Sequence, residues 1–204
     1  MVTGGARIPR RVLQPVGLAA LGFVGLAIIP PGSSTTKQNE RSWLAGDHHV
    51  HSQYSVDWND ATSPPTPIIA GDAKYPIPTN AARAREYGLT WMVSTDHGGP
   101  NHSKVNLELA YPELVGSRES VPELIQFYGM EFDTPGADHS SMIVPHSSRE
   151  QRTLHDLESQ FSKRDAFPRD STRDTEPRML DALRHMRVLP EPPVVIANHP
   201  SRSA

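Results

Sequence analysis

Short apolar runs alternate with helical patterns from Trp43 onward, and this rhythm limits the folds open to the chain more than any other feature. Such alternation is typical of an α/β domain, in which helices connect buried strands. The expected strands cover residues 43–50, 89–94, 123–128, 142–144 and 193–197. The expected helices cover residues 81–87, 149–161 and 177–187, the last two with an amphipathic pattern. The sequence therefore predicts an α/β fold.

Three long stretches carry no clear pattern of either kind. Residues 57–78 include five prolines, and residues 101–121 follow a predicted strand end, so we expect both to be loops that shape a pocket. Residues 162–176 are charged and are expected to form a surface excursion. Loops of this length in compact domains are usually functional or mobile.

The N-terminus has the layout of a targeting segment. Arg7, Arg10 and Arg11 precede an apolar run over residues 12–29, which a Pro-Pro-Gly turn closes. As a helix the run would be roughly 27 Å long against a hydrocarbon core of about 30 Å, so it could serve as an anchor or be cleaved. We expect residues 1–32 to be a signal sequence or membrane anchor and residues 33–42 to be a linker. A buried core helix is the alternative.

The arginine pair suggests a route of export. Arg10-Arg11 before Val12-Leu13 resembles a twin-arginine signal, which is used by proteins that acquire metal before export. The sequence thus predicts an extracytoplasmic protein, exported or tethered to a membrane through residues 12–29.

Charge and composition restrict the partners and the chemistry. The net charge is −3, and acids and bases are interspersed without a basic stripe, so nucleic acid is not an expected partner. The chain has ten histidines and no cysteine. A metal site would therefore use imidazole and carboxylate ligands, which suit zinc, manganese or iron.

Ligand-type residues lie at the ends of the expected strands, where active sites are built in α/β folds. In the first strand Asp47, His49 and His51 alternate, so we expect them to face one side while His48 points away. Further ligand-type residues at strand ends are Asp96, His97, Glu131, His139 and His199. The sequence predicts that these side chains meet in one metal site.

Four motifs in this order resemble the polymerase-and-histidinol-phosphatase (PHP) family of metal-dependent phosphoesterases. They are Asp47-His48-His49-Val50-His51-Ser52 with Ser55 and Asp57, Ser94-Thr95-Asp96-His97-Gly98, Gly129-Met130-Glu131, and Asn198-His199-Pro200. The resemblance covers nearly all of residues 43–204 and implies a PHP-like catalytic domain there. It also implies a distorted (β/α)7-type barrel with the site at its C-terminal face.

The resemblance implies two or three divalent metal ions, Zn, Mn or Fe. His49 and His51 would bind the first ion. Glu131 would bridge this ion to a second, which His139 and His199 would hold. The implied reaction is hydrolysis of a small-molecule phosphoester by a metal-activated water.

The remaining motif residues receive roles on the same basis. Asp57 and His97 would hold a third ion, with Asp57 at a position where some members have histidine. Asp96 and Asp47 would orient imidazoles, and Glu131 and Asp96 are the residues expected to serve catalysis most directly. His102 and His146, in expected loops, are candidate proton donors to a leaving group.

The chain departs from the family pattern at its C-terminal end. Family members usually finish the site with an Asp-x-His motif on a last strand, whereas this sequence stops at Ala204, soon after His199. We therefore expect a barrel that is incomplete at its C-terminal end, in a fragment, a truncated product or a domain that another chain completes.

Two other functions fit parts of the pattern. A metal-dependent amidohydrolase also begins its site with His-x-His, but this class normally adds a bridging lysine, and no lysine lies between Lys104 and Lys163. The second alternative is a non-catalytic extracytoplasmic module that binds metal or a phosphorylated ligand.

Overall fold

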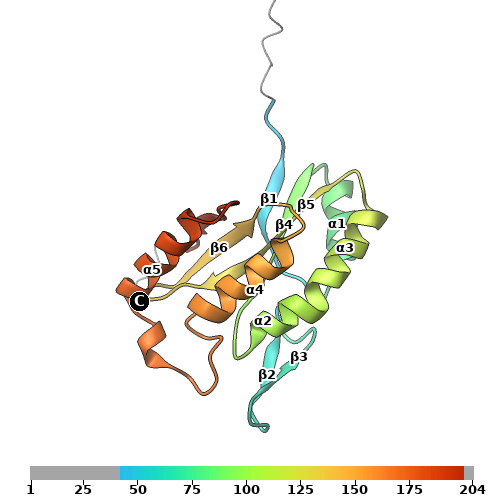
Figure 1. Ribbon diagram of the computed structural model, residues 1–204. Helices are drawn as coiled ribbons and strands as arrows, with labels where there is room; N and C mark the ends of the chain where they lie inside the picture. Colours follow the sequence, from blue (N-terminus) through green and yellow to red (C-terminus); the bar gives the residue numbers. More distant parts are fainter. Residues whose placement is uncertain (1–41, 200–204) are drawn as a thin grey trace, which may run out of the picture. The chain divides into compact units, whose positions relative to one another are not determined.

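The computed structural model of the protein describes residues 42–199 (Figure 1). The predicted signal or anchor at residues 1–32 and nearly all of the linker lie outside these residues. Within residues 42–199 no helix is both long and apolar enough to cross a membrane.

A curled sheet of five strands, shaped like half of a barrel, forms the centre of the domain (Figure 1). In spatial order its strands are β1 (Gly46–Val50), β4 (Trp91–His97), β5 (Ile125–Asp133), β6 (His139–Val144) and β7 (Val194–Ala197). The first three are parallel, β6 is antiparallel to β5, and β7 is antiparallel to β6. The predicted α/β class is confirmed, with a mixed sheet.

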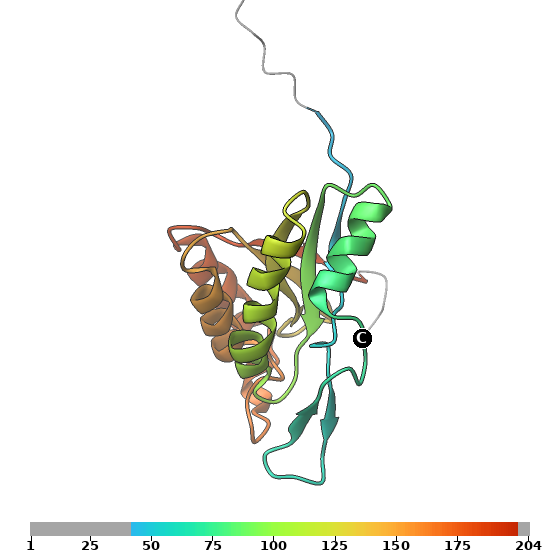
Figure 2. The same ribbon diagram turned by 90° about the vertical axis from the view of Figure 1, so that its right-hand side faces the viewer.

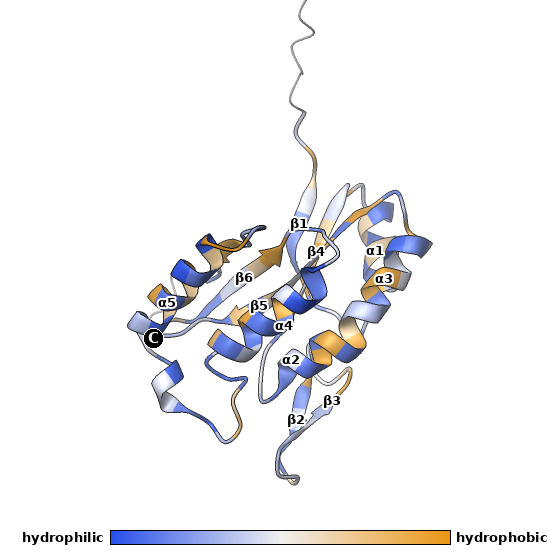
Figure 3. Cartoon of the chain, viewed as in Figure 1, coloured by the Kyte–Doolittle hydropathy of each residue, from blue (hydrophilic) through white to orange (hydrophobic). Residues whose placement is uncertain are grey.

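Five α-helices accompany the sheet: α1 (Ile77–Glu86), α2 (His102–Val105), α3 (Tyr111–Ser120), α4 (Glu150–Phe161) and α5 (Glu176–Arg187). A π-helix, Asn106–Ala110, joins α2 to α3, and a short 3-10 helix covers Ser171–Arg173. Figure 3 shows hydrophilic and hydrophobic residues on both α4 and α5, as expected for helices with one face toward a core.

The two faces of the sheet have different roles. Met92, Tyr128, Met130 and Met142 alternate along their strands and join the buried core with the helices. The residues between them point to the concave face, whose part near the N-terminal ends of β1, β4 and β5 is apolar and forms a hollow of about 460 Å³. The part of the same face near the C-terminal ends of these strands carries the histidines and Glu131, so strand alternation separates the core from the candidate site.

The sequence prediction of a loop at residues 101–121 is wrong, since this stretch is helical from His102 to Ser120. Val105, Ala110 and Leu114 recur at helical spacing and are buried. Pro112 lies inside this continuous helical stretch, because Ala110 and Tyr111 before it are also helical, and its missing amide hydrogen coincides with the π-helix that directly precedes α3.

Residues 57–78 also contain more structure than expected. β2 (Asp57–Asn59) and β3 (Thr66–Ile68) form an antiparallel hairpin, and α1 starts at Ile77 with Pro78 in its first turn. A two-stranded ribbon has only edge strands, which tolerate proline. Figures 1 and 2 both place this hairpin at the end of the sheet where β1 ends.

The topology brings the predicted ligands to one edge of the sheet. The C-terminal ends of β1, β4, β5 and β7 lie at this edge, and so does the start of β6, because β6 runs in the opposite direction. His139 begins β6, His97 ends β4, and His51 and His199 lie just beyond the ends of β1 and β7.

Candidate metal centre

Glu131 lies at the centre of the site, with three imidazoles around one of its carboxylate oxygens. Its Oε2 atom is 3.4 Å from His49 Nε2, 3.1 Å from His51 Nε2 and 3.0 Å from His97 Nδ1. These histidines come from the ends of β1 and β4. Parallel pairing places the end of β4 beside β5, with His97 opposite Glu131.

The other oxygen of Glu131 faces the later part of the chain. Oε1 lies 3.5 Å from His199 Nε2, 4.0 Å from His139 Nδ1 and 3.3 Å from Asn198 Nδ2. The side chain of Glu131 is only 1% exposed. A buried carboxylate surrounded by imidazoles is a donor set that could hold a metal ion.

Two further observations support the fit of these imidazole and carboxylate donors to a metal ion. His49 Nε2 and His51 Nε2 lie 2.9 Å apart, so both nitrogens point to one place beside Glu131. His97 Nδ1 is buried and forms no hydrogen bond of good geometry within residues 42–199, which leaves a ring nitrogen directed at the carboxylate. Buried polar atoms normally have a partner, and a metal ion would provide it.

Within residues 42–199, two groups of side chains have donor atoms close enough to hold an ion. One consists of His49, His51 and Glu131, and the other of His51, Asp72 and His97, with donor atoms within 4.8 Å of one another. His51 belongs to both. A neutral imidazole has one free nitrogen lone pair, so His51 can ligate in only one group at a time.

Asp72, and not Asp57, is the carboxylate that lies beside His51 and His97. Asp72 Oδ2 is 3.6 Å from His51 Nδ1 and accepts a 2.7 Å hydrogen bond from Ser55 Oγ. Asp57 is exposed in β2 and packs against Gly71, and the structure does not bring it into either group. No spacing in the sequence distinguishes Asp72, because only the turn after the hairpin brings it back to the site.

His139 has a carboxylate partner of its own that the sequence analysis missed. Its Nε2 atom lies 3.3 Å from Oδ1 of the buried Asp133, and its Nδ1 atom lies 2.9 Å from Asp138. Asp133 and Glu131 share the concave face because they are two residues apart on β5. Asp133 fixes the ring that faces Glu131.

Ser141 and Asn198 support the histidines of β1. Ser141 Oγ lies 3.0 Å from His49 Nδ1, 3.3 Å from His48 Nδ1 and 3.1 Å from Asn198 Oδ1. The prediction that His48 points away from His49 is wrong, because the β1 register is irregular between Asp47 and Val50 and turns both rings toward Ser141.

Asp96 and Asp47 bind backbone rather than imidazoles. Asp96 is fully buried and accepts hydrogen bonds from the amide and the hydroxyl of Ser52, so it fixes the turn that follows His51. Asp47 is exposed and accepts a 2.9 Å hydrogen bond from the amide of His49. Neither aspartate orients a ring directly, which corrects that part of the expectation.

No family model, curated protein or solved structure matches this chain.

Burial and neighbouring charge oppose each other in the pKa values of the site. Burial by itself raises the pKa of Glu131, but hydrogen bonds from His49 and His51 outweigh it and hold the pKa well below its usual range. Burial lowers the pKa of His97. For His51, burial is outweighed by the bond to Glu131, which raises the pKa. Glu131 is therefore an anion that a cation would stabilise.

Two other expected site histidines lie elsewhere. His102 is fully buried, with Nδ1 2.8 Å from Glu158 and Nε2 2.9 Å from the carbonyl oxygen of Tyr54. His146 follows β6 at the opposite edge of the sheet and contacts Glu150. Neither histidine has Glu131 among its partners within residues 42–199.

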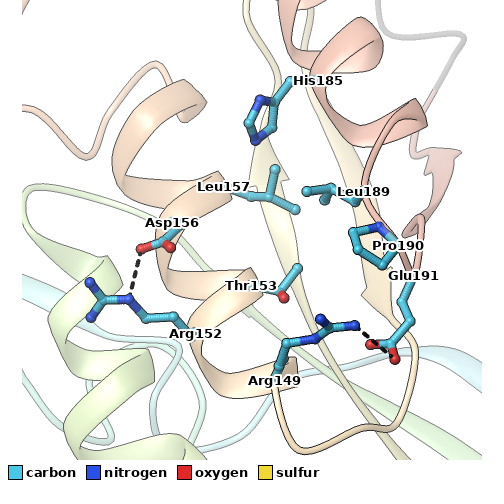
Figure 4. Close-up of a pocket in the computed structure, with 9 residues that line it drawn as sticks. All are labelled: Arg149, Arg152, Thr153, Asp156, Leu157, His185, Leu189, Pro190 and Glu191. Atoms are coloured by element: carbon cyan, nitrogen blue, oxygen red, sulfur yellow. Dashed lines mark ion pairs between the residues drawn. The ribbon is translucent and has the colours of Figure 1, made fainter.

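A separate cavity of about 250 Å³ lies between α4 and α5 (Figure 4). Two ion pairs line it, Arg152 with Asp156 and Arg149 with Glu191, each at 3.3 Å. Arg149 and Glu191 lie near the end of β6 and the start of β7, which is the edge opposite the metal centre. This cavity does not belong to the candidate site.

Proposed function

We propose that this protein is a metal-dependent phosphoesterase of the PHP type, acting on a small-molecule phosphoester. The observation that carries the proposal is Glu131, a buried carboxylate with five imidazoles around its two oxygens. The curled half-barrel sheet is consistent with an incomplete barrel. We propose that it is part of a (β/α)7-type barrel. The proposed location is extracytoplasmic.

The donor atoms suggest where two or three divalent ions would bind. Glu131 Oε2 with His49 and His51 would hold one ion, and Oε1 with His139 and His199 would hold another. His97 and Asp72 offer a further pair. Bound divalent ions supply an acidified water as nucleophile and neutralise charge on the phosphoryl oxygens.

The protein's own groups hold these ligands in place. Ser141 and Asn198 fix His49, Asp133 fixes His139, and Asp96 fixes the turn after His51. Partners of this kind set ring orientation and are worth about ten- to a hundredfold in metal affinity or activity. Burial of Glu131 excludes water from the shared carboxylate and strengthens its attraction for cations.

Metal content and hydrolysis, measured on the same sample of full-length protein, test the proposal. We expect two or more ions per chain by mass spectrometry, with hydrolysis of p-nitrophenyl phosphate or its bis ester. Both should be lost in His49→Ala and Glu131→Ala. Folded protein that binds no metal would overturn the proposal, and tight metal binding without hydrolysis of either ester would favour the non-catalytic binding module.

A further inference from the structure

A cleft of about 460 Å³ opens beside the metal centre, between the β2–β3 hairpin and residues 162–176. Its apolar walls are Trp58, Pro65, Pro100 and Phe167. Pro100 lies three residues after His97, the last residue of β4, and Trp58 follows Asp57 in β2, so the cleft opens at the edge of the sheet that carries the site. Its volume falls in the range of small-molecule sites, about 300 to 1,000 Å³. We refer to it as the Trp58–Phe167 cleft.

Arg164 connects this cleft to the metal centre. Its Nη1 atom lies 3.4 Å from Asp133 Oδ1, and the same oxygen lies 3.3 Å from His139 Nε2. Only one carboxylate therefore separates a guanidinium group that lines the cleft from an imidazole beside Glu131. A ligand whose reacting group sits at Glu131 would extend its remaining atoms toward Arg164.

The segment that carries the cations is fixed to the sheet from two sides. The amide of Lys163 donates to the Asp133 carbonyl oxygen at 3.1 Å, which ties the segment to β5. The buried Asp165 accepts a bond from the Ser103 amide at 2.8 Å, and its carbonyl oxygen accepts one from the Asn101 amide at 2.8 Å. The backbone on either side of Arg164 is thereby held beside the end of β5.

Three cations line the cleft, and two of them already contact an acid. Lys163, Arg164 and Arg169 line it with Asp60 and Asp174. Lys163 pairs with Asp174 at 3.8 Å, and Arg164 contacts Asp133. Within residues 42–199 no ion pair involves Arg169, which is exposed. In the cavity of Figure 4, by contrast, Arg149 and Arg152 are each neutralised by an acid.

The two aromatic walls favour a flat ligand. The Trp58 indole packs against the core, and its Nε1 atom would lie 2.3 Å from a Cβ atom at Gly99, so only glycine leaves room for the ring there. Phe167 is 42% exposed. Rigid aromatic rings bind planar groups through stacking and edge contacts.

We propose that the Trp58–Phe167 cleft is the leaving-group subsite and takes an aromatic leaving group that carries a second negative charge. The inference rests on the proposed function, since it places the scissile phosphoryl group at Glu131. Arg169, with Arg164, would bind the second anion, and Trp58 and Phe167 would bind the ring. Arg164 and Arg169 determine substrate specificity, whereas the metal centre carries out the chemical step.

The first experiment compares two substrates that differ in one charge. We would measure kcat/KM of the full-length, Mn²⁺-loaded protein for 4-carboxyphenyl phosphate and 4-carbamoylphenyl phosphate. One charge-assisted contact corresponds to about a tenfold preference for the carboxylate. In Arg169→Gln the ratio of the two kcat/KM values should fall to about 2 or less. The ratio cancels any general loss of activity.

Arg152→Gln is the matched control, because it removes the same charge from the cavity of Figure 4 and should leave the ratio unchanged. A wild-type ratio near 1, or an unchanged ratio in Arg169→Gln, would overturn the subsite while leaving the phosphoesterase proposal intact.

A binding measurement separates failure of the subsite from failure of the function. On the same Mn²⁺-loaded protein, calorimetry should give tighter binding of 4-phosphonobenzoate than of phenylphosphonate, by about tenfold, and Arg169→Gln should remove the difference. If neither phosphate ester is hydrolysed but this difference is found, the subsite stands and the function fails. Equal binding of the two phosphonates, or binding of neither, overturns the subsite.

The aromatic walls are tested with an aliphatic probe. 4-Phosphonobenzoate should bind about tenfold more tightly than 3-phosphonopropionate, and Phe167→Ala should reduce that preference to about threefold or less, because a stacked ring is lost. Equal affinity of wild-type protein for the two phosphonates would remove the aromatic part of the proposal.

Discussion

His49 Nε2 and His51 Nε2 lie 2.9 Å apart, two ring nitrogens from one strand end that face the same point. Glu131 Oε2 lies 3.4 Å and 3.1 Å from them. Two imidazole nitrogens and one carboxylate oxygen thus converge on one point. A cation at this point would satisfy all three donors at once.

Replacing Glu131 should abolish the site while leaving the fold intact. Glu131→Gln keeps the shape of the side chain but removes the charge that faces five imidazoles. We expect loss of at least one metal ion per chain and a fall in phosphoesterase activity of about a hundredfold or more, since the site then lacks its shared anion. Metal analysis and p-nitrophenyl phosphate hydrolysis check this, with the exposed Glu119→Gln as control. Full metal content in Glu131→Gln would contradict it.

The roles of Asp72 and Asp57 can be separated by a matched pair of variants. Asp72→Asn should lower metal occupancy or activity by about ten- to a hundredfold, whether Asp72 ligates an ion or orients His51. Asp57→Asn should change either quantity by less than about twofold, because its carboxylate belongs to neither group and surface changes are usually small. The reverse order of effects would restore Asp57 as the ligand.

Ser141 should matter to metal affinity although it cannot replace a ligand. Its hydroxyl lies 3.0 Å from His49 Nδ1 and donates to Asn198 Oδ1. We expect Ser141→Ala to weaken metal binding by about tenfold, because the His49 ring loses a contact that fixes its orientation. Titration with Zn²⁺ in competition with a chelating dye measures this, beside the exposed Ser148→Ala. Equal affinities in the two variants would exclude the positioning role.

The buried pair of His102 and Glu158 should make the folded state less stable as pH rises into the alkaline range. Burial alone would lower the pKa of His102, but the charge and hydrogen bond of Glu158 outweigh it and raise the pKa to about 9. Both ring nitrogens face acceptors, so the protonated ring satisfies both. Because the pKa is raised in the folded state, the stabilisation is complete below the ordinary pKa of 6.5 and is lost as pH rises toward about 9.

Thermal unfolding measured between pH 6 and pH 10 checks the direction of this pH dependence. The Tm of the wild-type protein should fall across the window from 6.5 to about 9. His102→Gln should have a lower Tm at pH 6 and a flatter slope, since the titrating group is gone. Parallel slopes in the two proteins would assign the pH dependence to other groups.

Metal removal should lower stability, because ions bind the folded site and not the unfolded chain. At a metal concentration a thousandfold above Kd the stabilisation is about 4 kcal/mol, which corresponds to a Tm shift of about 10 °C for a domain of this size. We expect a fall of that order after dialysis against EDTA and recovery on adding Mn²⁺ or Zn²⁺. If the protein loses its metal in EDTA but its Tm does not change, the proposed metal centre at Glu131 is contradicted.

The α/β class, most strand positions and the meeting of His49, His51, His97 and Glu131 followed from the sequence. Buried strands appear as apolar runs, and side chains at the ends of parallel strands meet at one edge whatever the loops do. His139 was also expected in the site, and it reaches the same edge because β6 is antiparallel to β5 and begins there.

The sequence alone determined which residue types end the strands, and hence that imidazole and carboxylate side chains meet at one edge of the sheet. Only the tertiary structure decided that Asp72 stands where Asp57 was expected, that Asp133 links His139 to Arg164, and that residues 102–120 are helical. These contacts depend on how a hairpin and a surface segment return to the sheet. The positions of these segments are fixed by packing and by backbone hydrogen bonds between residues far apart in the chain. Such contacts leave no local periodicity in the sequence.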